Sequence, residues 1–291
     1  MAFDTPPVSP FDIAQTHPGL GVLRMAALLA ETDVEPDEEA LDLMFEQVEA
    51  GLLAELAPQD LWPELARGLM APAPANMLLA LRGCGALSVL LPEVSALFGV
   101  PQISDDDIDV DLGEHVLNSL TEAARCDASL AARFALLVMN VGKADSPKEH
   151  LPVHYKHMDR GRPRIEDMCR RLGAPQDCRD LALLALAECE RVHRVSKVRA
   201  GPVAAMLERL SAFRNPPRYA QLISVCVCDF RAYNGHAGQI YAKAALLETA
   251  IAACRASDAA QPAADDEERV AAHAQAIAKA FNSERWSAPE S

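Results

Sequence analysis

The stretch RFALLVMNVGK, residues 133–143, joins a continuous apolar run to a glycine–lysine end. The apolar run predicts a buried helix, and the polar and glycine residues after it predict a loop where that helix ends. Helical periodicity continues on both sides of this stretch. Together these features predict an all-α fold class.

Towards the N-terminus, residues 36–51 place apolar side chains at i, i+3, i+4 and i+7, after acidic residues and before a closing glycine. Residues 57–70 repeat this pattern, with a break expected near Trp62 because Pro63 suits a helix start. Residues 74–99 predict short helices separated by glycine and proline. HPGLG, residues 17–21, predicts a turn into a helix that begins at Val22.

Towards the C-terminus, helical patterns recur through residue 255, and no alternating run with hairpin-turn residues interrupts them. Residues 256–268, ASDAAQPAADDEE, predict a flexible acidic linker. A last amphipathic helix is expected over residues 268–281.

Composition limits the possible classes of function. The 291-residue chain has a net charge of −15 and no run of 18 apolar residues, so we expect a cytoplasmic protein without a membrane partner. Residues 143–218 nevertheless carry 16 Lys/Arg against 10 Asp/Glu, which leaves a basic central third between acidic flanks. This charge pattern fits either ordinary solvated helix faces or a phosphate-binding patch.

Several motifs are weaker than they look. SDDDIDVDLGEH, residues 104–115, lacks the glycine and glutamate of an EF-hand, and no strand is expected behind its acidic residues, so we expect a solvated loop. The eight cysteines are not arranged in CxxC pairs and are expected to be reduced thiols of the core. Cys226 and Cys228 form a lone CxC motif, which alone indicates metal binding only weakly.

Dispersed histidines are the remaining candidate ligands. Helices can bring such groups together around a metal ion that faces a cleft, although isolated surface histidines are more common. The candidate ligands for a divalent metal are His115, His154, His157, His193 and Asp229.

Two long segments carry a family resemblance. Residues 37–65 (DEEALDLMFEQVEAGLLAELAPQDLWPEL) and residues 78–102 (LLALRGCGALSVLLPEVSALFGVPQ) resemble the neck and body helices of bacterial CCA-adding tRNA nucleotidyltransferases, which add or repair the 3′ CCA end of tRNA. DLGEHVLNSL, RFALLVMNVGK, PVHYKHMDRGRPRIEDMCRRLGAP and CDFRAY extend the resemblance, which covers roughly residues 14–255.

The resemblance implies a tandem architecture. It places a flexible N-terminus at residues 1–13, a neck/body-like helical bundle at 14–100, a degenerate HD-like helical domain at 101–255 and an acidic linker with a C-terminal helix at 256–291. The catalytic head of the family, with its sheet, Gly-Ser loop and DxD pair, is expected to be missing.

Two further departures concern chemistry. The family's base-reading acidic pair and arginine correspond to His17, Pro18 and Gly21, which cannot make those hydrogen bonds. The metal-binding His-Asp pair of the HD-type domain corresponds to Met139 and Asn140. A thioether and an amide are poor substitutes for imidazole and carboxylate as metal ligands. Another family histidine corresponds to Cys189. No catalytic residue and no cofactor are therefore expected, with a divalent metal left as an alternative.

Three functions stay open. The first is a non-catalytic module that binds tRNA or another RNA by phosphate contacts. The second is an interaction or regulatory scaffold, including self-association or pairing with a separate nucleotidyltransferase head. The third is a residual metal-dependent HD phosphohydrolase. The candidate RNA contacts are Arg160, Arg162, Arg164, Arg170, Arg171, Arg194, Lys197, Arg199, Arg214 and Arg218.

Overall fold

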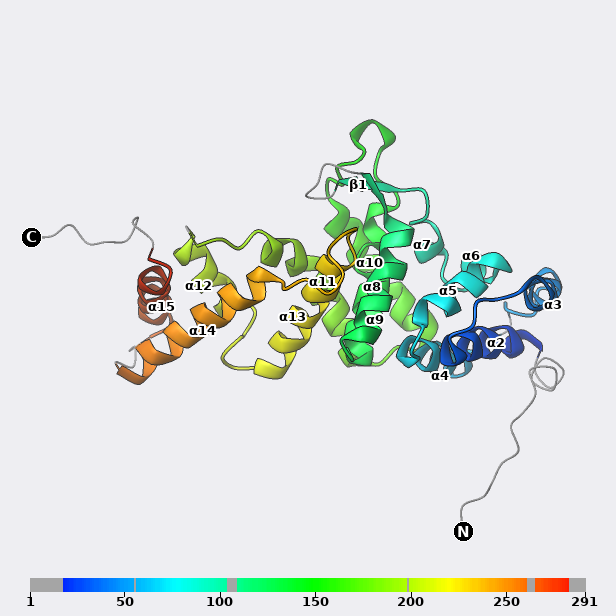
Figure 1. Ribbon diagram of the computed structural model, residues 1–291, viewed down its shortest axis with the longest axis horizontal. Coiled ribbons are helices and arrows are strands. Elements are labelled where there is room, and N and C mark those ends of the chain that lie inside the picture. Colours follow the sequence, from blue (N-terminus) through cyan, green and yellow to red (C-terminus); the bar gives the residue numbers. More distant parts are fainter. Residues whose placement is uncertain (1–17, 55, 104–108, 198, 261–264, 283–291) are drawn as a thin grey trace, which may run out of the picture.

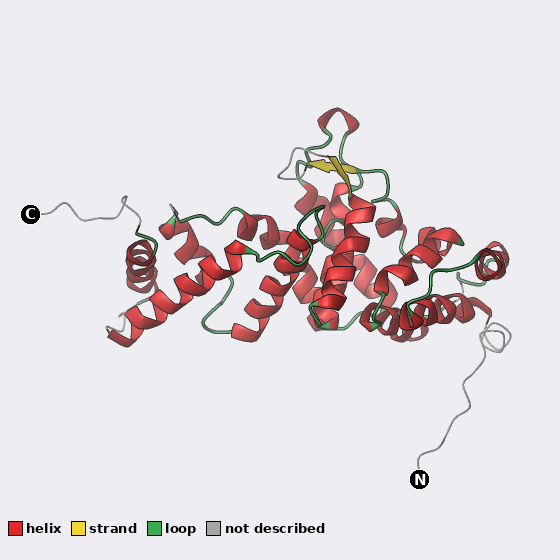
Figure 2. Cartoon of the chain, in the orientation of Figure 1, coloured by secondary structure: helices red, strands yellow, loops and turns green. Residues whose placement is uncertain are grey.

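The computed structural model of the chain describes residues 18–54, 56–103, 109–197, 199–260 and 265–282. Helices dominate these residues, and the all-α prediction is confirmed (Figure 2). The N-terminal elements are α2 (Pro18–Thr32), α3 (Glu38–Glu49), α4 (Pro58–Met70), α5 (Pro74–Gly83), α6 (Ala86–Leu90) and α7 (Pro92–Ser95).

The middle of the chain contains the strands and the longest buried helices. Its elements are β1 (Pro101–Ile103), β2 (Asp109–Asp111), α8 (Leu112–Arg125), α9 (Leu130–Val138), the 3-10 helices η1 (Val141–Lys143) and η2 (Lys148–His150), α10 (His157–Leu172) and α11 (Gln176–His193). The C-terminal elements are α12 (Ala200–Arg209), α13 (Pro216–Arg231), α14 (Ala242–Ala260) and α15 (Asp266–Ala280).

The helices form an elongated array with α3 near one end and α15 near the other (Figure 1). α2 packs against α4 and α5, α9 against α11, and α11 against α13, while α15 lies on α12 and α14. One hydrophobic cluster runs through the array from Val22 to Phe281. Residues 134–139 of the opening stretch are all buried within it, as their apolar run predicts.

The acidic segment contains a strand that the sequence did not predict. β1 and β2 pair antiparallel, with Pro101 opposite Asp111 and Ile103 opposite Asp109. Three residues per strand are too few for an alternating pattern to show. Asp111 also caps α8, because its carboxylate accepts a 3.0 Å hydrogen bond from the backbone N–H of Glu114. Residues 104–108, the rest of the expected loop, lie outside the described residues.

One predicted helix start and one predicted helix break are wrong. α2 begins at Pro18, a residue suited to the first helical turn, so Gly19 and Gly21 lie within the helix. A Cβ on Gly19 would clash with the backbone at Leu52, which explains the small residue there. α4 continues through Pro63, its sixth residue, which lies on an exposed face where the carbonyl of Gln59, left without its helical hydrogen bond, can reach water.

The expected acidic linker is mostly helix. α14 continues to Ala260, and α15 begins at Asp266, where the Asp265 carboxylate accepts a hydrogen bond from Glu268 N–H. The acidic residues fit this start because they interact favourably with the positive end of the helix dipole. The last helix is therefore docked, starting two residues before the expected position. Residues 261–264 lie outside the described part, as do His17 and residues 1–13.

Among the described helices, none combines the length and hydropathy that a membrane span requires. All eight cysteines are free thiols, and seven are buried, which confirms the expectation of reduced core cysteines.

Candidate functional site

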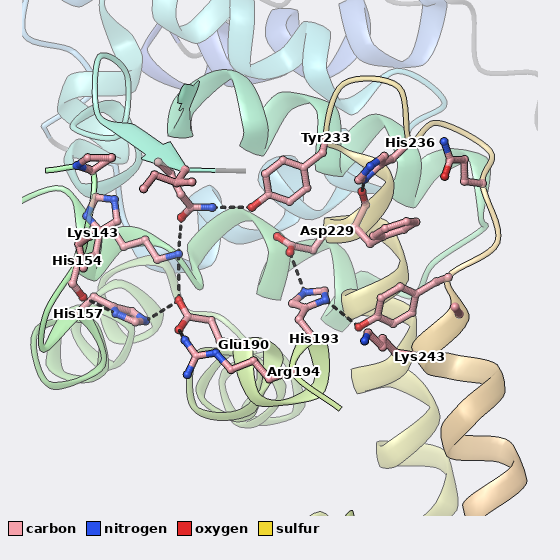
Figure 3. Close-up of a pocket in the computed structure, with 18 of the residues that line it drawn as sticks. Lys143, His154, His157, Glu190, His193, Arg194, Asp229, Tyr233, His236 and Lys243 are labelled. Carbon is pink, nitrogen blue, oxygen red and sulfur yellow. Dashed lines mark hydrogen bonds and ion pairs between the residues drawn. The ribbon is translucent and has the colours of Figure 1, made fainter. Parts of the chain in front are cut away.

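A pocket of about 830 Å³ opens where the ends of α11 and α13 meet the β-hairpin and the segment before α10 (Figure 3). Its charged and histidine residues are Lys143, His154, His157, Glu190, His193, Arg194, Asp229, His236 and Lys243. Its aromatic residues are Tyr155, Phe230, Tyr233 and Tyr241. Its volume falls within the roughly 300–1,000 Å³ typical of small-molecule sites.

Asp229 is the centre of one side of the site. Its Oδ1 lies 2.9 Å from Nε2 of His115, and its Oδ2 lies 3.0 Å from Nε2 of His193. Three helices, α8, α11 and α13, thus bring together three of the five predicted remnant ligands. His193 also contacts Tyr241, with 2.7 Å between its Nδ1 and the phenolic oxygen.

The contacts around Asp229 favour its ionised form. Burial alone would raise the pKa of Asp229, but His115 and His193 hold that pKa well below its usual range. Burial would lower the pKa of His193, whereas Cys189 and Asp229 raise it to about 11. The result at neutral pH is an ion pair between His193 and Asp229.

Met139 and Asn140 lie beside this ion pair. Both are buried, and both line a small pocket of about 70 Å³ together with Cys189, His193 and Asp229. The structure therefore places the thioether and the amide next to the remnant ligands. This donor set does not fit the hard divalent ion of an HD-type phosphohydrolase, which is held by imidazole and carboxylate groups.

Lys143 dominates the other side of the pocket, and sequence reasoning missed it. Its ammonium group donates a 2.6 Å hydrogen bond to Oε1 of Gln102 and lies 3.4 Å from Oε1 of Glu190. Gln102 in turn donates to the hydroxyl of Tyr233 at 2.6 Å, while Nε2 of His157 lies 3.3 Å from Glu190. Burial would raise the pKa of Glu190, but Lys143 and His157 lower it. The only sequence signal was a lysine directly after the glycine of the opening stretch.

His154 does not join the Asp229 group, because both of its ring nitrogens contact other protein atoms. Nε2 lies 3.0 Å from the carbonyl oxygen of Pro101, and Nδ1 lies 2.8 Å from Oγ of Ser146. Arg160 donates to the same Oγ at 3.0 Å. A neutral ring satisfies both contacts, with Nε2–H donating to the Pro101 carbonyl and Nδ1 accepting from the Ser146 hydroxyl. Burial, reinforced by Lys143, lowers the pKa of His154 to about 4.

This neutral ring predicts a loss of stability in acid. As the pH falls below 6.5, the unfolded chain protonates His154 before the folded chain does, so unfolding becomes easier until pH 4. We expect about 1 to 2 kcal/mol of unfolding free energy to be lost this way, because solvent screens the half-exposed ring. Urea titrations at pH 7 and pH 4.5 should show a smaller loss in His154→Gln. The exposed His150→Gln is the control, and an equal loss in all three proteins would contradict the prediction.

The ten basic residues divide into three groups. The guanidinium groups of Arg160, Arg164 and Arg171 are engaged in the fold: Arg160 donates to the carbonyls of Gly142 and Tyr155, Arg164 to Val141, and Arg171 to Leu90 and Glu93. Arg162, Arg170, Arg194 and Arg214 form ion pairs at the surface, and Arg218 reaches a backbone carbonyl. Lys197 and Arg199 are exposed, and no side-chain contact links them to another described residue.

Three curated relatives, each named multifunctional CCA protein, are 41–43% identical to this chain over the aligned residues. The Paracidovorax citrulli protein is 42% identical over 253 residues, or 87% of this chain and 60% of the relative. The Paraburkholderia phymatum and Burkholderia pseudomallei proteins are 41% and 43% identical over 240 residues, or 82% of this chain and 57–58% of each relative. The chain thus spans about three fifths of their length, and the family resemblance is confirmed. No family model matches the chain.

Proposed function

Because the chain is a homologue of the multifunctional CCA proteins, we propose that it binds tRNA or another RNA at the 830 Å³ pocket without hydrolysing it. One observation carries the proposal: the same pocket presents cationic and aromatic side chains. Arg194 and Lys243 offer charge for phosphates, and Tyr155, with 60% of its surface exposed, offers a face on which a base can stack.

The positive charge continues beyond the pocket along a basic edge, which we define as Arg194, Lys197, Arg199 and Lys243. The first three belong to the connection between α11 and α12, and the side chain of Arg194 is 75% exposed. Lys243 donates a 2.8 Å hydrogen bond to the Val195 carbonyl, which ties α14 to that connection. Exposed cations of this kind contact phosphates without reading sequence.

The absence of hydrolysis rests on Met139 and Asn140. They occupy the wall where the resemblance requires a metal-binding His–Asp pair, and neither supplies a carboxylate or imidazole. If purified protein loaded with Ni²⁺ or Mn²⁺ hydrolysed a 2′,3′-cyclic nucleotide, a residual phosphohydrolase would be the correct function instead.

RNA binding through the basic edge should depend strongly on salt and on Arg194. With three or four phosphate contacts, affinity for tRNA should fall roughly 20- to 50-fold between 50 and 200 mM salt. Arg194→Glu should weaken binding about 10-fold, because it replaces attraction by repulsion at the pocket rim. Arg255→Glu, an equal change of charge on the exposed surface of α14, is the matched control.

A salt-titrated gel shift measures these effects, using tRNA with and without its CCA end and a random RNA of equal length. Equal loss of affinity in the two variants would contradict a role for the basic edge. No binding of any RNA at 50 mM salt would contradict the proposed function. That second outcome would favour a protein partner, such as a separate head or a second copy, for which the exposed Val34 and Phe45 beside and on α3 are the candidate surface.

A further inference from the structure

Two neighbouring helices carry four potential zinc ligands at spacings that place each pair on one face of its helix. Cys189 and His193 are four residues apart on α11, and Cys226 and Asp229 are three residues apart on α13. Residues at these spacings lie on the same side of a helix. Because α11 packs against α13, the two pairs face each other.

The donor atoms are close enough to share one ion. Sγ of Cys189 lies 3.3 Å from Nε2 of His193, and the donor atoms of Cys189, His193 and Cys226 all lie within 4.8 Å of one another. Oδ2 of Asp229 lies 3.0 Å from the same Nε2. Metal–ligand bonds of 2.0–2.3 Å in a tetrahedron separate neighbouring donors by roughly 3.3–3.8 Å. Small side-chain movements would therefore bring the donors of Cys189, His193 and Cys226 around one ion, and Asp229, which lies outside this group of three, would have to move towards the thiols to supply a fourth ligand.

The contacts that orient metal ligands are already present. Tyr241 contacts Nδ1 of His193 at 2.7 Å, which leaves Nε2 facing the thiols. His115 contacts the second oxygen of Asp229 at 2.9 Å. In metal sites, ligating histidines and carboxylates are characteristically held by such outer hydrogen bonds, which fix the tautomer and orientation.

We infer that Cys189, His193 and Cys226 form a binding site for a Zn²⁺-like ion, with Asp229 as the fourth ligand once its carboxylate moves towards the thiols. The two thiols and the imidazole match the preference of Zn²⁺ for sulfur and nitrogen, and binding would release the thiol protons and the Nε2 proton. Four protein ligands close the coordination sphere, which is typical of structural rather than catalytic zinc. Cys189, His193 and Asp229 line the 70 Å³ pocket, which provides the path for the ion.

This site differs from an HD-type centre in its chemistry. It depends on two sulfur ligands and does not use Met139 or Asn140. Cobalt distinguishes the two arrangements, because only thiolate ligation gives a near-ultraviolet sulfur-to-cobalt charge-transfer band, accompanied by the intense visible bands of tetrahedral Co²⁺.

The experiment titrates Co²⁺, then competing Zn²⁺, into the full reduced chain after chelator treatment. We expect one ion per chain and a charge-transfer band that Zn²⁺ abolishes. Cys226→Ser and Cys189→Ser should lose at least half of that band. Cys228→Ser is the matched control, because this equally buried thiol lies on the same helix but contacts Cys126 instead.

Absence of the band in the wild-type chain would overturn the inference, and so would its full retention in Cys226→Ser. If a serine variant does not fold, alkylation of the wild-type chain decides the question. Zn²⁺ should protect Cys189 and Cys226, as identified by mass spectrometry, at least 10-fold more than it protects Cys228. Equal protection of all three thiols would also overturn the inference.

Discussion

Gly142→Ala is expected to lower the free energy of unfolding by about 3 kcal/mol. A Cβ at this position would lie 2.6 Å from the backbone nitrogen of Gly161 and 2.8 Å from its Cα, and closer still to the carbonyl oxygen of His157. These are backbone atoms of α10, so no side chain can rotate to make room. The first turns of α10 would have to move away from η1.

This displacement of α10 would also change the pocket. Arg160 donates a 3.0 Å hydrogen bond to the carbonyl of Gly142, and Lys143 and His157 adjoin the contact between η1 and α10. Gly142→Ala should therefore weaken the proposed RNA binding as well as the stability of the fold. Urea denaturation followed by far-ultraviolet circular dichroism measures the first effect, and the tRNA gel shift measures the second.

Gly161→Ala is the control, because Gly161 is the opposite member of the same contact. Its Cβ would meet the ends of the flexible Leu186 side chain at 3.0 and 3.2 Å, and alanine favours the helix by about 1 kcal/mol. We expect a net change within about 1 kcal/mol. Equal destabilisation by the two substitutions would show that the backbone contact is not the cause.

Arg133→Met is expected to lower the free energy of unfolding by about 2 to 4 kcal/mol. Arg133 is 3% exposed and forms no ion pair with any described residue. Instead its Nη1 donates to the carbonyls of Leu69 at 2.8 Å and Ala71 at 3.0 Å, and its Nε donates to Ala128 at 2.9 Å. Methionine would fill much of the volume but would leave three buried carbonyls without donors.

Arg133→Lys tests the geometry of this arrangement. A lysine keeps the charge but cannot donate from a planar fork to carbonyls on two sides, so it should restore less than half of the lost stability. Arg170→Met, at a side chain that is 78% exposed and paired only with surface Asp167, should change stability by less than about 0.5 kcal/mol. Thermal and urea denaturation measure all three variants. Full rescue by lysine would mean that charge alone matters.

The helices were predictable from the sequence because their apolar residues recur at helical spacing over many turns. The β-hairpin was not, since its strands are three residues long and its pairing depends on tertiary contacts. Composition misled at residues 256–268, where the acidic residues that suggested a linker instead begin α15. At Pro63, the rule that proline breaks helices failed because the proline lies on an exposed face, where water can replace the helical hydrogen bond that it removes.

The site was predictable only in part. His115, His193 and Asp229 were candidate metal ligands in the sequence, and the structure brings them together. The cluster of Cys189, His193 and Cys226 depends on how two helices pack, which spacing within one helix cannot reveal. Arg160 and Arg171 are engaged in the fold, whereas Lys197 is exposed, and this difference depends on tertiary partners. The sequence could not reveal it, because all three are basic residues in the same segment.

The acidic residues at the starts of α3 and α15 lie towards opposite ends of the elongated molecule, and the basic edge lies between them. Such a distribution is negative towards both ends and positive along a segment between them, nearer to α15 than to α3 (Figure 1). Charges act over only about 8–10 Å at physiological ionic strength, so an approaching polyanion senses the nearest part of the surface rather than the total charge of −15. The acidic ends would repel a polyanion, and the basic edge would attract it from the side of the molecule. This difference selects the docking orientation before any contact forms.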